Sequence, residues 1–376
     1  MIYFDNASTT KPDKDVLDAF VKASEENYAN PHSIHRLAVD NAANIERKKQ
    51  EILKDLNLSS RDYEVIFTSG ATESNNIIIQ GFAHRNKKRF SHLLTSNIEH
   101  SSVENVFKEL EKEGFKVDYI KVTKEGVLDF DDLRAHLDGK PVFASFMAVN
   151  NEIGTVNNLE KIREIIGPEG ILHSDLVQGL GKAKINFSSL DMMTFTSHKI
   201  YGLKGCGCFI KKRKINLSPI VFGGNQEEGL RSGTMDYPSI CAFTLAVSKV
   251  IKDYDKGFEN VKEIRDYIAS ELKKVDGVIV HDFINASPYI LSISLTKKKA
   301  SVVVEGLSNE DIFVNSVSAC NSRTDAKSFV IEAIGCSELE AKNPIRLSFG
   351  KYNTINEAKE FVKVFKKILE SIKSED

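Results

Sequence analysis

The sequence predicts an α/β fold with a mostly parallel central sheet, followed by a smaller α+β domain. The first observation is an alternation from about residue 14 to 250, where helical stretches such as Asn41–Leu56 and Ser101–Glu113 separate short apolar runs. These runs are Glu64–Thr68, His92–Thr95, Val142–Ala148, Ile171–His173, Met192–Phe195 and Gly207–Ile210. Several are nearly continuous in apolar residues, as strands buried on both faces should be. Strands that alternate with helices favour a parallel sheet.

The second observation is a change of pattern after about residue 255. A charged amphipathic helix over Phe258–Lys274 is followed by apolar strand-like runs over Tyr289–Ser294 and Asp311–Val317, then by a helix over about Asn356–Ser371. We therefore expect a large domain at residues 14–255. The small domain is expected to comprise residues 1–13 and 256–376.

Composition excludes several classes of protein. The 376 residues include 51 basic and 53 acidic side chains, a formal charge of −2, so no global charge points to nucleic acid or an anionic membrane. The start, Met1 to Asp5, lacks the pattern of a signal peptide, and no apolar run reaches the roughly 20 residues that span a bilayer. We expect a cytoplasmic protein whose five cysteines are reduced thiols.

The cysteines do not indicate a metal site in the protein alone. Cys206 and Cys208 lie in a strand pattern, where they would point to opposite faces and make a poor metal pair. We expect both in the core, together with Cys241 and Cys336, since free cysteine is often buried. No zinc spacing, Walker loop or nucleophile-elbow motif is present.

Polar residues gather where the apolar runs end. Ser69 to Thr72 follow one run, His100, Asn151 and Asp175 follow others, and Thr196 to Lys199 follow another. In an open α/β sheet, ligands bind beyond the carboxyl ends of the strands. The sequence therefore predicts one site, and Lys199 is its candidate nucleophile. A lone lysine after a strand is usually exposed, but a lysine that forms a Schiff base must lie beside the aldehyde cofactor.

The neighbouring pieces suit pyridoxal 5′-phosphate (PLP). Ser69 to Asn76 place a glycine and a threonine at a helix start, a plausible phosphate cradle or simply a capped helix. Asp175 could keep the pyridine nitrogen protonated, or act as a helix N-cap. His100 could stack on a planar cofactor and move protons, or be structural.

Two further candidates lie late in the chain. Cys320 sits in a small, polar, loop-like stretch, which favours a nucleophile over a core residue. Arg346 interrupts an apolar strand, and its guanidinium suits capture of a substrate carboxylate or an internal ion pair.

Taken together, these motifs resemble the cysteine desulfurases of the NifS/IscS type, in the class V aminotransferase family. The resemblance runs from Tyr3 to Arg346. The matching segments are Asn30-Pro31 with Ser33-Ile34-His35, Phe67 to Ser74, Val149 to Gly154, Ser197 to Gly202, Leu230 to Thr234 and Ser318-Ala319-Cys320. The family implies the PLP-transferase fold of type I, PLP as cofactor and L-cysteine as substrate. L-alanine and a persulfide on Cys320 would be the products, and an iron–sulfur scaffold or a thiolation enzyme would take the sulfur.

The resemblance also implies roles for single residues. Lys199 would form the Schiff base, His100 would stack on the ring and exchange protons, Asp175 would pair with the pyridinium nitrogen, and Gln178 would donate to the ring hydroxyl. Asn151 and Arg346 would hold the substrate. Thr234 would reach the phosphate of a neighbouring subunit, which implies a homodimer. Cys320 would accept sulfur and could transiently ligate a scaffold's iron–sulfur cluster. The phosphate cradle would comprise Ala71, Thr72, Thr196, Ser197 and His198.

The chain departs from the family pattern at Leu176, Ser197, Leu203, Asn225 and Val317. Val317 stands where glycine is usual, so we expect the Cys320 loop to move less freely. The chain ends 30 residues after Arg346, which puts docking of an iron–sulfur scaffold in doubt. The nearest alternative is a sister enzyme such as a selenocysteine lyase. A nucleotide-dependent oxidoreductase would need a GxGxxG turn in its first βαβ unit, and none is there.

Overall fold

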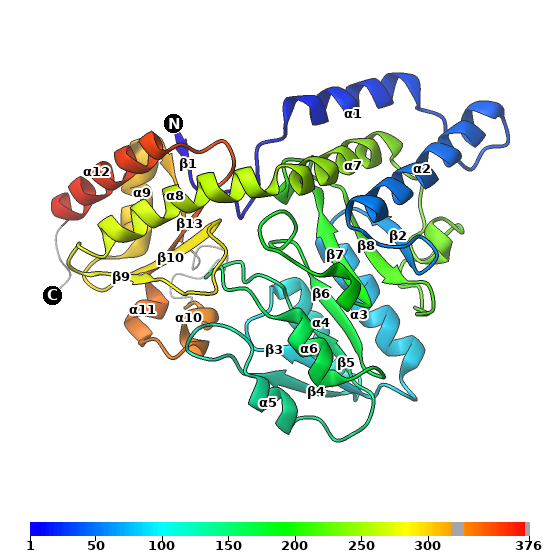
Figure 1. The fold of residues 1–376 in the computed structure, drawn as a ribbon, viewed down its shortest axis with the longest axis horizontal. Coiled ribbons are helices and arrows are strands. Elements are labelled where there is room, and N and C mark those ends of the chain that lie inside the picture. The colour runs from blue at the N-terminus through cyan, green and yellow to red at the C-terminus, as the bar shows by residue number, and fades with distance from the viewer. Residues whose placement is uncertain (317–326, 373–376) are drawn as a thin grey trace.

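The structure, a computed structural model, describes residues 1–316 and 327–372. Its larger sheet has seven strands in the order β2-β8-β7-β6-β5-β3-β4 (Figure 1). Among these seven, β8 alone runs in the opposite direction to the other six, so the predicted α/β fold with a mostly parallel sheet is confirmed. The strands are β2 (Tyr63–Thr68), β3 (His92–Ser96), β4 (Lys116–Ile120), β5 (Phe143–Ser145), β6 (Ile171–Asp175), β7 (Met192–Thr196) and β8 (Gly207–Lys212).

Helices cover both faces of this sheet. Alternate residues of one strand enter different cores, as Met192 and Met193 do, because successive side chains of a strand point to opposite faces. One core is closed by α3 (Ala71–Asn86) and α4 (Ser101–Lys112). The other includes residues of α1 (Lys14–Glu26), α2 (Arg36–Asp55), α5 (Phe130–Ala135), α6 (Leu159–Ile166) and α7 (Tyr237–Lys252). Burial on both faces explains why the strand runs are almost wholly apolar.

A second, antiparallel sheet follows in the order β12-β13-β10-β9. Its strands are β9 (Val278–His281), β10 (Ile290–Leu295), β12 (Asn315–Ser316) and β13 (Pro344–Ser348). It shares a core with α8 (Tyr254–Leu272), α9 (Ala300–Asn309) and α12 (Ile355–Ser371). Ile2 and Phe4 lie in the same core, and β1 (Ile2–Tyr3) pairs in parallel with β11 (Ile312–Phe313). The exact domain boundaries stay a prediction.

Two short helices that follow the second sheet's strand β12 in sequence pack against the larger part. Hydrophobic side chains of α10 (Phe329–Ala333) and α11 (Glu338–Lys342) form a small core with Ile98, Val122 and Ile153 from the larger part. These helices follow the segment that contains Cys320, a residue outside the described ranges.

The structure corrects the expected strand over Asp311–Val317. Within the described part of this segment, β11 pairs with β1 and β12 pairs with β13. The chain changes partners at the buried Val314, so an apolar run that looked like one strand serves two sheets. Two strands that the sequence reading missed, β4 and β9, each lie at the edge of a sheet, where one-sided exposure weakens the apolar signal.

The cysteines behave as expected only in part. Cys206 and Cys208 are buried in the core, whereas Cys241 and Cys336 are half-buried, which corrects their assignment to the core. Cys336 lies between α10 and α11, and its side chain packs at the margin of the small core there. In the described ranges, no helix combines the length and the apolar character needed to cross a membrane.

Candidate active site

A cavity of about 610 Å³ lies beyond the ends of the parallel strands. Its walls come from the segments that follow β2, β3, β5, β6 and β7, and it is completed by Ala7 and Ser8 and by Arg346 from β13. Ten residues singled out from the sequence line it together. They are Ala71, Thr72, His100, Asn151, Asp175, Gln178, Thr196, His198, Lys199 and Arg346.

One wall is the start of α3. Its N-cap, Gly70, has no side chain to satisfy the first amides of the helix, and it borders the cavity with Ala71 and Thr72. A Cβ on Gly207 of β8 would lie 2.8 Å from the Cα of Gly70, so glycine here permits a close approach of two backbones. An uncapped helix start of this kind is a ready-made site for an anion such as phosphate.

Asp175, at the end of β6, is held in place by two hydrogen bonds. The side-chain amide of Asn75 donates to Oδ2 at 2.8 Å, and the backbone amide of Val177 donates to Oδ1 at 2.9 Å. The second bond stabilises a turn and does not cap a helix, because the residues that follow Asp175 form turns and no helix begins there. The carboxylate also lines the cavity.

Asn75 also connects Asp175 to His100. Its amide donates to Ser102 Oγ at 2.9 Å, and Ser102 Oγ lies 2.9 Å from His100 Nδ1. The backbone amide of Ser102 donates to the same Nδ1 at 3.2 Å, so Nδ1 is the acceptor and Nε2 carries the proton of the neutral ring. Burial lowers the pKa of His100, with the charges of Lys199 and Arg346 adding to this and Asp175 opposing it.

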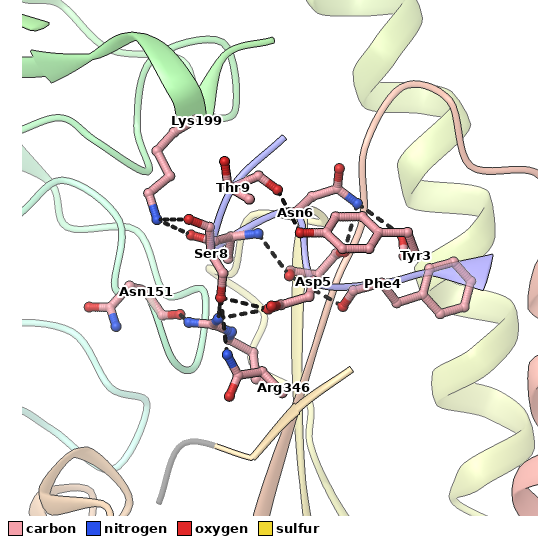
Figure 2. A network of polar contacts seen from close by, with 12 residues as sticks. Tyr3, Phe4, Asp5, Asn6, Ser8, Thr9, Asn151, Lys199 and Arg346 are labelled. Carbon is pink, nitrogen blue, oxygen red and sulfur yellow. Dashed lines mark hydrogen bonds and ion pairs between the residues drawn. The ribbon is translucent and has the colours of Figure 1, made fainter. Parts of the chain in front are cut away.

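Lys199 ends the short 3₁₀ turn Ser197–Lys199 that directly follows β7. Its Nζ donates to the backbone carbonyls of Ala7 and Ser8 at 2.5 and 2.6 Å. Figure 2 shows the side chain reaching from its strand end to the N-terminal segment. The site therefore depends on a segment about 190 residues away in sequence.

Arg346 contacts the same segment (Figure 2). Its two terminal nitrogens donate to the backbone carbonyl of Asn151 at 2.9 Å, to Asp5 Oδ1 at 3.0 Å and to Ser8 Oγ at 2.7 Å. The ion pair with Asp5 was the structural alternative for this arginine, and it is present. Arg346 also lines the cavity, so the ion pair with Asp5 holds the guanidinium group at the cavity wall.

Three predicted site residues do not line the cavity. Ser197 is buried, but its hydroxyl lies against Gly202, where an added Cβ would be 2.0 Å from Oγ. Thr234 is exposed on the surface after a β-bridge at Arg231. Cys320 is outside the residues that the structure describes.

Sequence reasoning missed several groups that support the site. Asp5 and Ser8 hold Arg346, and Asn75 and Ser102 join Asp175 to His100, but none belongs to a pattern that predicts such contacts.

The buried Lys182 donates to Gln178 Oε1 at 2.6 Å, and the four-residue spacing of this pair was its available signal. Burial, with the charges of Lys199 and Arg346, lowers the pKa of Lys182 to about 7.

Comparison with known proteins places this chain in a class. The family model described as "Aminotransferase class-V" matches residues 2–361, so the chain belongs to the class-V aminotransferases.

Within that class, the chain belongs with the cysteine desulfurases of the NifS/IscS type, which confirms the resemblance seen in the sequence. It is 33% identical to cysteine desulfurase IscS 1 of Archaeoglobus fulgidus, over 100% of this chain and 98% of the relative. It is 37% identical to a NifS/IcsS protein homolog of Lactobacillus delbrueckii subsp. bulgaricus, over 98% and 97% of the two chains. A solved NifS-like protein of Rickettsia africae superposes with a TM-score of 0.88 at 28% identity, covering 98% and 99% of the two chains.

Proposed function

We propose that this protein is a PLP-dependent cysteine desulfurase that converts L-cysteine to L-alanine and keeps the sulfur as a persulfide on Cys320. One observation carries the proposal: a single cavity brings together an uncapped helix start, a fixed carboxylate, a lysine and an arginine. These groups suit, in turn, the phosphate, the ring nitrogen and the aldehyde of PLP, and the carboxylate of an amino acid.

The described residues fit PLP. The amides at the start of α3 and the hydroxyls of Thr72 and Thr196 would hold the phosphate, and Asp175 would lie at the ring nitrogen. His198 and Gln178 border the same cavity, and Gln178 would donate to the ring hydroxyl. When bound, PLP supplies an electron sink for bonds around the substrate α-carbon.

The chain itself would manage protons and orientation. His100 carries a proton on Nε2 because Ser102 occupies Nδ1, so Nε2 can donate at the cavity wall. Lys199 Nζ would attach the cofactor and then move a proton to or from the substrate. Arg346 and Asn151 would hold the substrate carboxylate. A similar solved structure is titled "SspA in complex with cysteine", which supports cysteine as the substrate class.

The position of Cys320 in the chain is compatible with its proposed role. On the side before it, Asn315 Nδ2 donates to Ser8 Oγ at 3.0 Å, and on the side after it, Ser328 Oγ donates to Glu152 Oε2 at 2.6 Å. Ser8 lines the cavity, and Glu152 directly follows Asn151, which also lines it. In the proposed step the Cys320 thiolate attacks the substrate sulfur and the sulfur–carbon bond breaks. The carbon skeleton leaves as L-alanine after protonation.

A homodimer is part of the proposal. Large apolar side chains stand exposed in one N-terminal stretch and near Thr234, notably Ile34 at 99%, Phe222 at 82% and Tyr28 at 75%. A homodimer interface would bury apolar side chains of this kind, and Thr234 would reach the partner's phosphate across it. The sulfur acceptor, an iron–sulfur scaffold or a thiolation enzyme, and the cytoplasmic location stay predictions.

The test is direct. The purified protein should show the absorbance of lysine-bound PLP, and with L-cysteine and a reductant it should release sulfide and alanine in equal amounts. Lys199→Ala should lose both signals, and Cys320→Ala should lose turnover but keep the PLP. Cys241→Ala, a half-buried cysteine on α7, serves as the control and should stay active. A protein that takes up no PLP, or full turnover by Cys320→Ala, would contradict the proposal.

A further inference from the structure

A second group of reactive side chains lies outside the cavity. His281 is the last residue of β9, Cys336 lies between α10 and α11, and Glu340 is in α11 (Figure 1). One potential ligand atom from each of these three residues lies within 4.8 Å of the other two. None of the three lines the cavity that holds Lys199.

Hydrogen bonds fix the tautomer of His281. Ser294 Oγ donates its proton to the backbone carbonyl of Glu340 at 3.0 Å. The same Oγ lies 2.8 Å from His281 Nε2, and with its proton committed it must accept there. His281 therefore carries its proton on Nε2 and presents the lone pair of Nδ1 to Cys336 Sγ, 4.0 Å away. Metal-binding histidines are held in this way, with the other ring nitrogen donating to a fixed acceptor.

Glu340 is held in place as well. Ser337 donates to Glu340 Oε2 from its amide at 2.9 Å and from its hydroxyl at 2.6 Å, within the capping box of α11. The capping box uses Oε2 and so orients the whole carboxylate. The group thus contains an imidazole with a directed lone pair, a carboxylate of restricted rotation and a thiol.

We propose that His281, Cys336 and Glu340 bind a zinc ion. Sulfur, imidazole nitrogen and carboxylate oxygen are the ligand types that zinc accepts, whereas magnesium and calcium require mostly oxygen. A thiolate and a carboxylate together balance the charge of a divalent cation, and three protein ligands leave a fourth position for water.

The ion would join two structural units. His281 belongs to the β9–β10 pair, whereas Cys336 and Glu340 belong to the α10–α11 unit that packs against Ile98 and Ile153 of the larger part. A bound zinc would fasten that unit to the antiparallel sheet. The ion would therefore link these two units at a place separate from the cavity that Lys199 lines.

Zinc content of the PLP-loaded enzyme tests the proposal. After incubation with zinc and dialysis, elemental analysis should find one zinc per chain in the wild type and in Cys320→Ser, which removes the thiol proposed to accept sulfur. Cys336→Ser and His281→Gln should bind zinc at least tenfold more weakly. Cys241→Ser provides the matched control of a half-buried thiol elsewhere and should bind like the wild type.

Cobalt provides a spectroscopic check that does not depend on activity. Tetrahedral cobalt at this site should give ligand-field bands at longer wavelengths than PLP absorbs, and Cys336→Ser should lose them. Circular dichroism establishes that each variant is folded. Zinc binding that survives in folded Cys336→Ser, that is lost in Cys320→Ser, or that is absent from the wild type would overturn the proposal.

Discussion

Lys182 Nζ donates a hydrogen bond of 2.6 Å to Gln178 Oε1 beneath the cavity. The amide of Gln178 in turn donates to the carbonyl of Ala7 at 2.8 Å, and Lys199 Nζ donates to the same carbonyl at 2.5 Å. A buried lysine thus fixes the orientation of Gln178 and is connected to Lys199 through one backbone oxygen. Because the amino group of Lys182 is buried and contacts Gln178, we expect this lysine to affect both the free energy of unfolding and the orientation of Gln178 at the cavity wall.

The first prediction concerns pH and stability. Burial lowers the pKa of Lys182 to about 7, whereas an unfolded lysine titrates near 10.4. Between these values the unfolded chain binds the extra proton, so stability increases with pH as the cost of the buried charge is relieved. Relative to Lys182→Met, the wild type should gain about 2 kcal/mol in free energy of unfolding from pH 7 to pH 9, at about 1.4 kcal/mol per pKa unit. Urea denaturation at several pH values measures this, and parallel profiles for the two proteins would contradict it.

The second prediction concerns Arg346. Arg346→Lys keeps the positive charge but cannot reach Asn151, Asp5 and Ser8 together or offer two parallel donors to a carboxylate. Hydrogen bonds to charged groups contribute about 1.5–3 kcal/mol, so KM for L-cysteine should rise at least about tenfold, with a smaller change in kcat. Arg163→Lys is the matched control, because Arg163 pairs with Asp191 away from the cavity. Steady-state kinetics that leave KM unchanged in Arg346→Lys would argue against a role in substrate binding.

The third prediction concerns Asn75, which the sequence did not single out. Asn75→Leu has a similar volume but removes the donor to Asp175 Oδ2 and to Ser102 Oγ. We expect kcat to fall about tenfold and PLP to be held less tightly, because a lost hydrogen bond to a buried charged group costs about 1.5–3 kcal/mol. Asn75→Asp should be worse, since it places a second carboxylate beside Asp175. The order wild type, Leu, Asp in kcat and PLP affinity is the signature to look for. Wild-type kinetics in Asn75→Leu would show that Asp175 needs no such support.

Much of the cavity wall could be predicted because its residues follow buried strands. Strands covered on both faces leave continuous apolar runs, and the polar residues at their carboxyl ends, such as His100, Asp175 and Lys199, must meet at one edge of a parallel sheet. The local apolar pattern and the general rule for parallel sheets were therefore enough to predict that these residues lie close together.

The contacts that complete the site could not be predicted in this way. Asp5 and Ser8 meet Arg346 across more than 330 residues, and no periodicity encodes such a contact. Ser197 sits in the predicted segment, but the tight turn to Gly202 directs its hydroxyl away from the cavity. The Asp311–Val317 run was misread because an apolar stretch does not show where a chain changes sheets.

The last prediction concerns Thr234, which lies exposed and away from the cavity of its own chain. If the chain forms the proposed homodimer, Thr234→Ala should weaken PLP binding by about tenfold, because one hydrogen bond to a charged phosphate is lost. Thr234→Ser, which keeps the hydroxyl, should restore it. Light scattering should show dimers for all three proteins. A monomeric wild type, or PLP affinity unchanged in Thr234→Ala, would mean that each chain binds the cofactor without help from a partner.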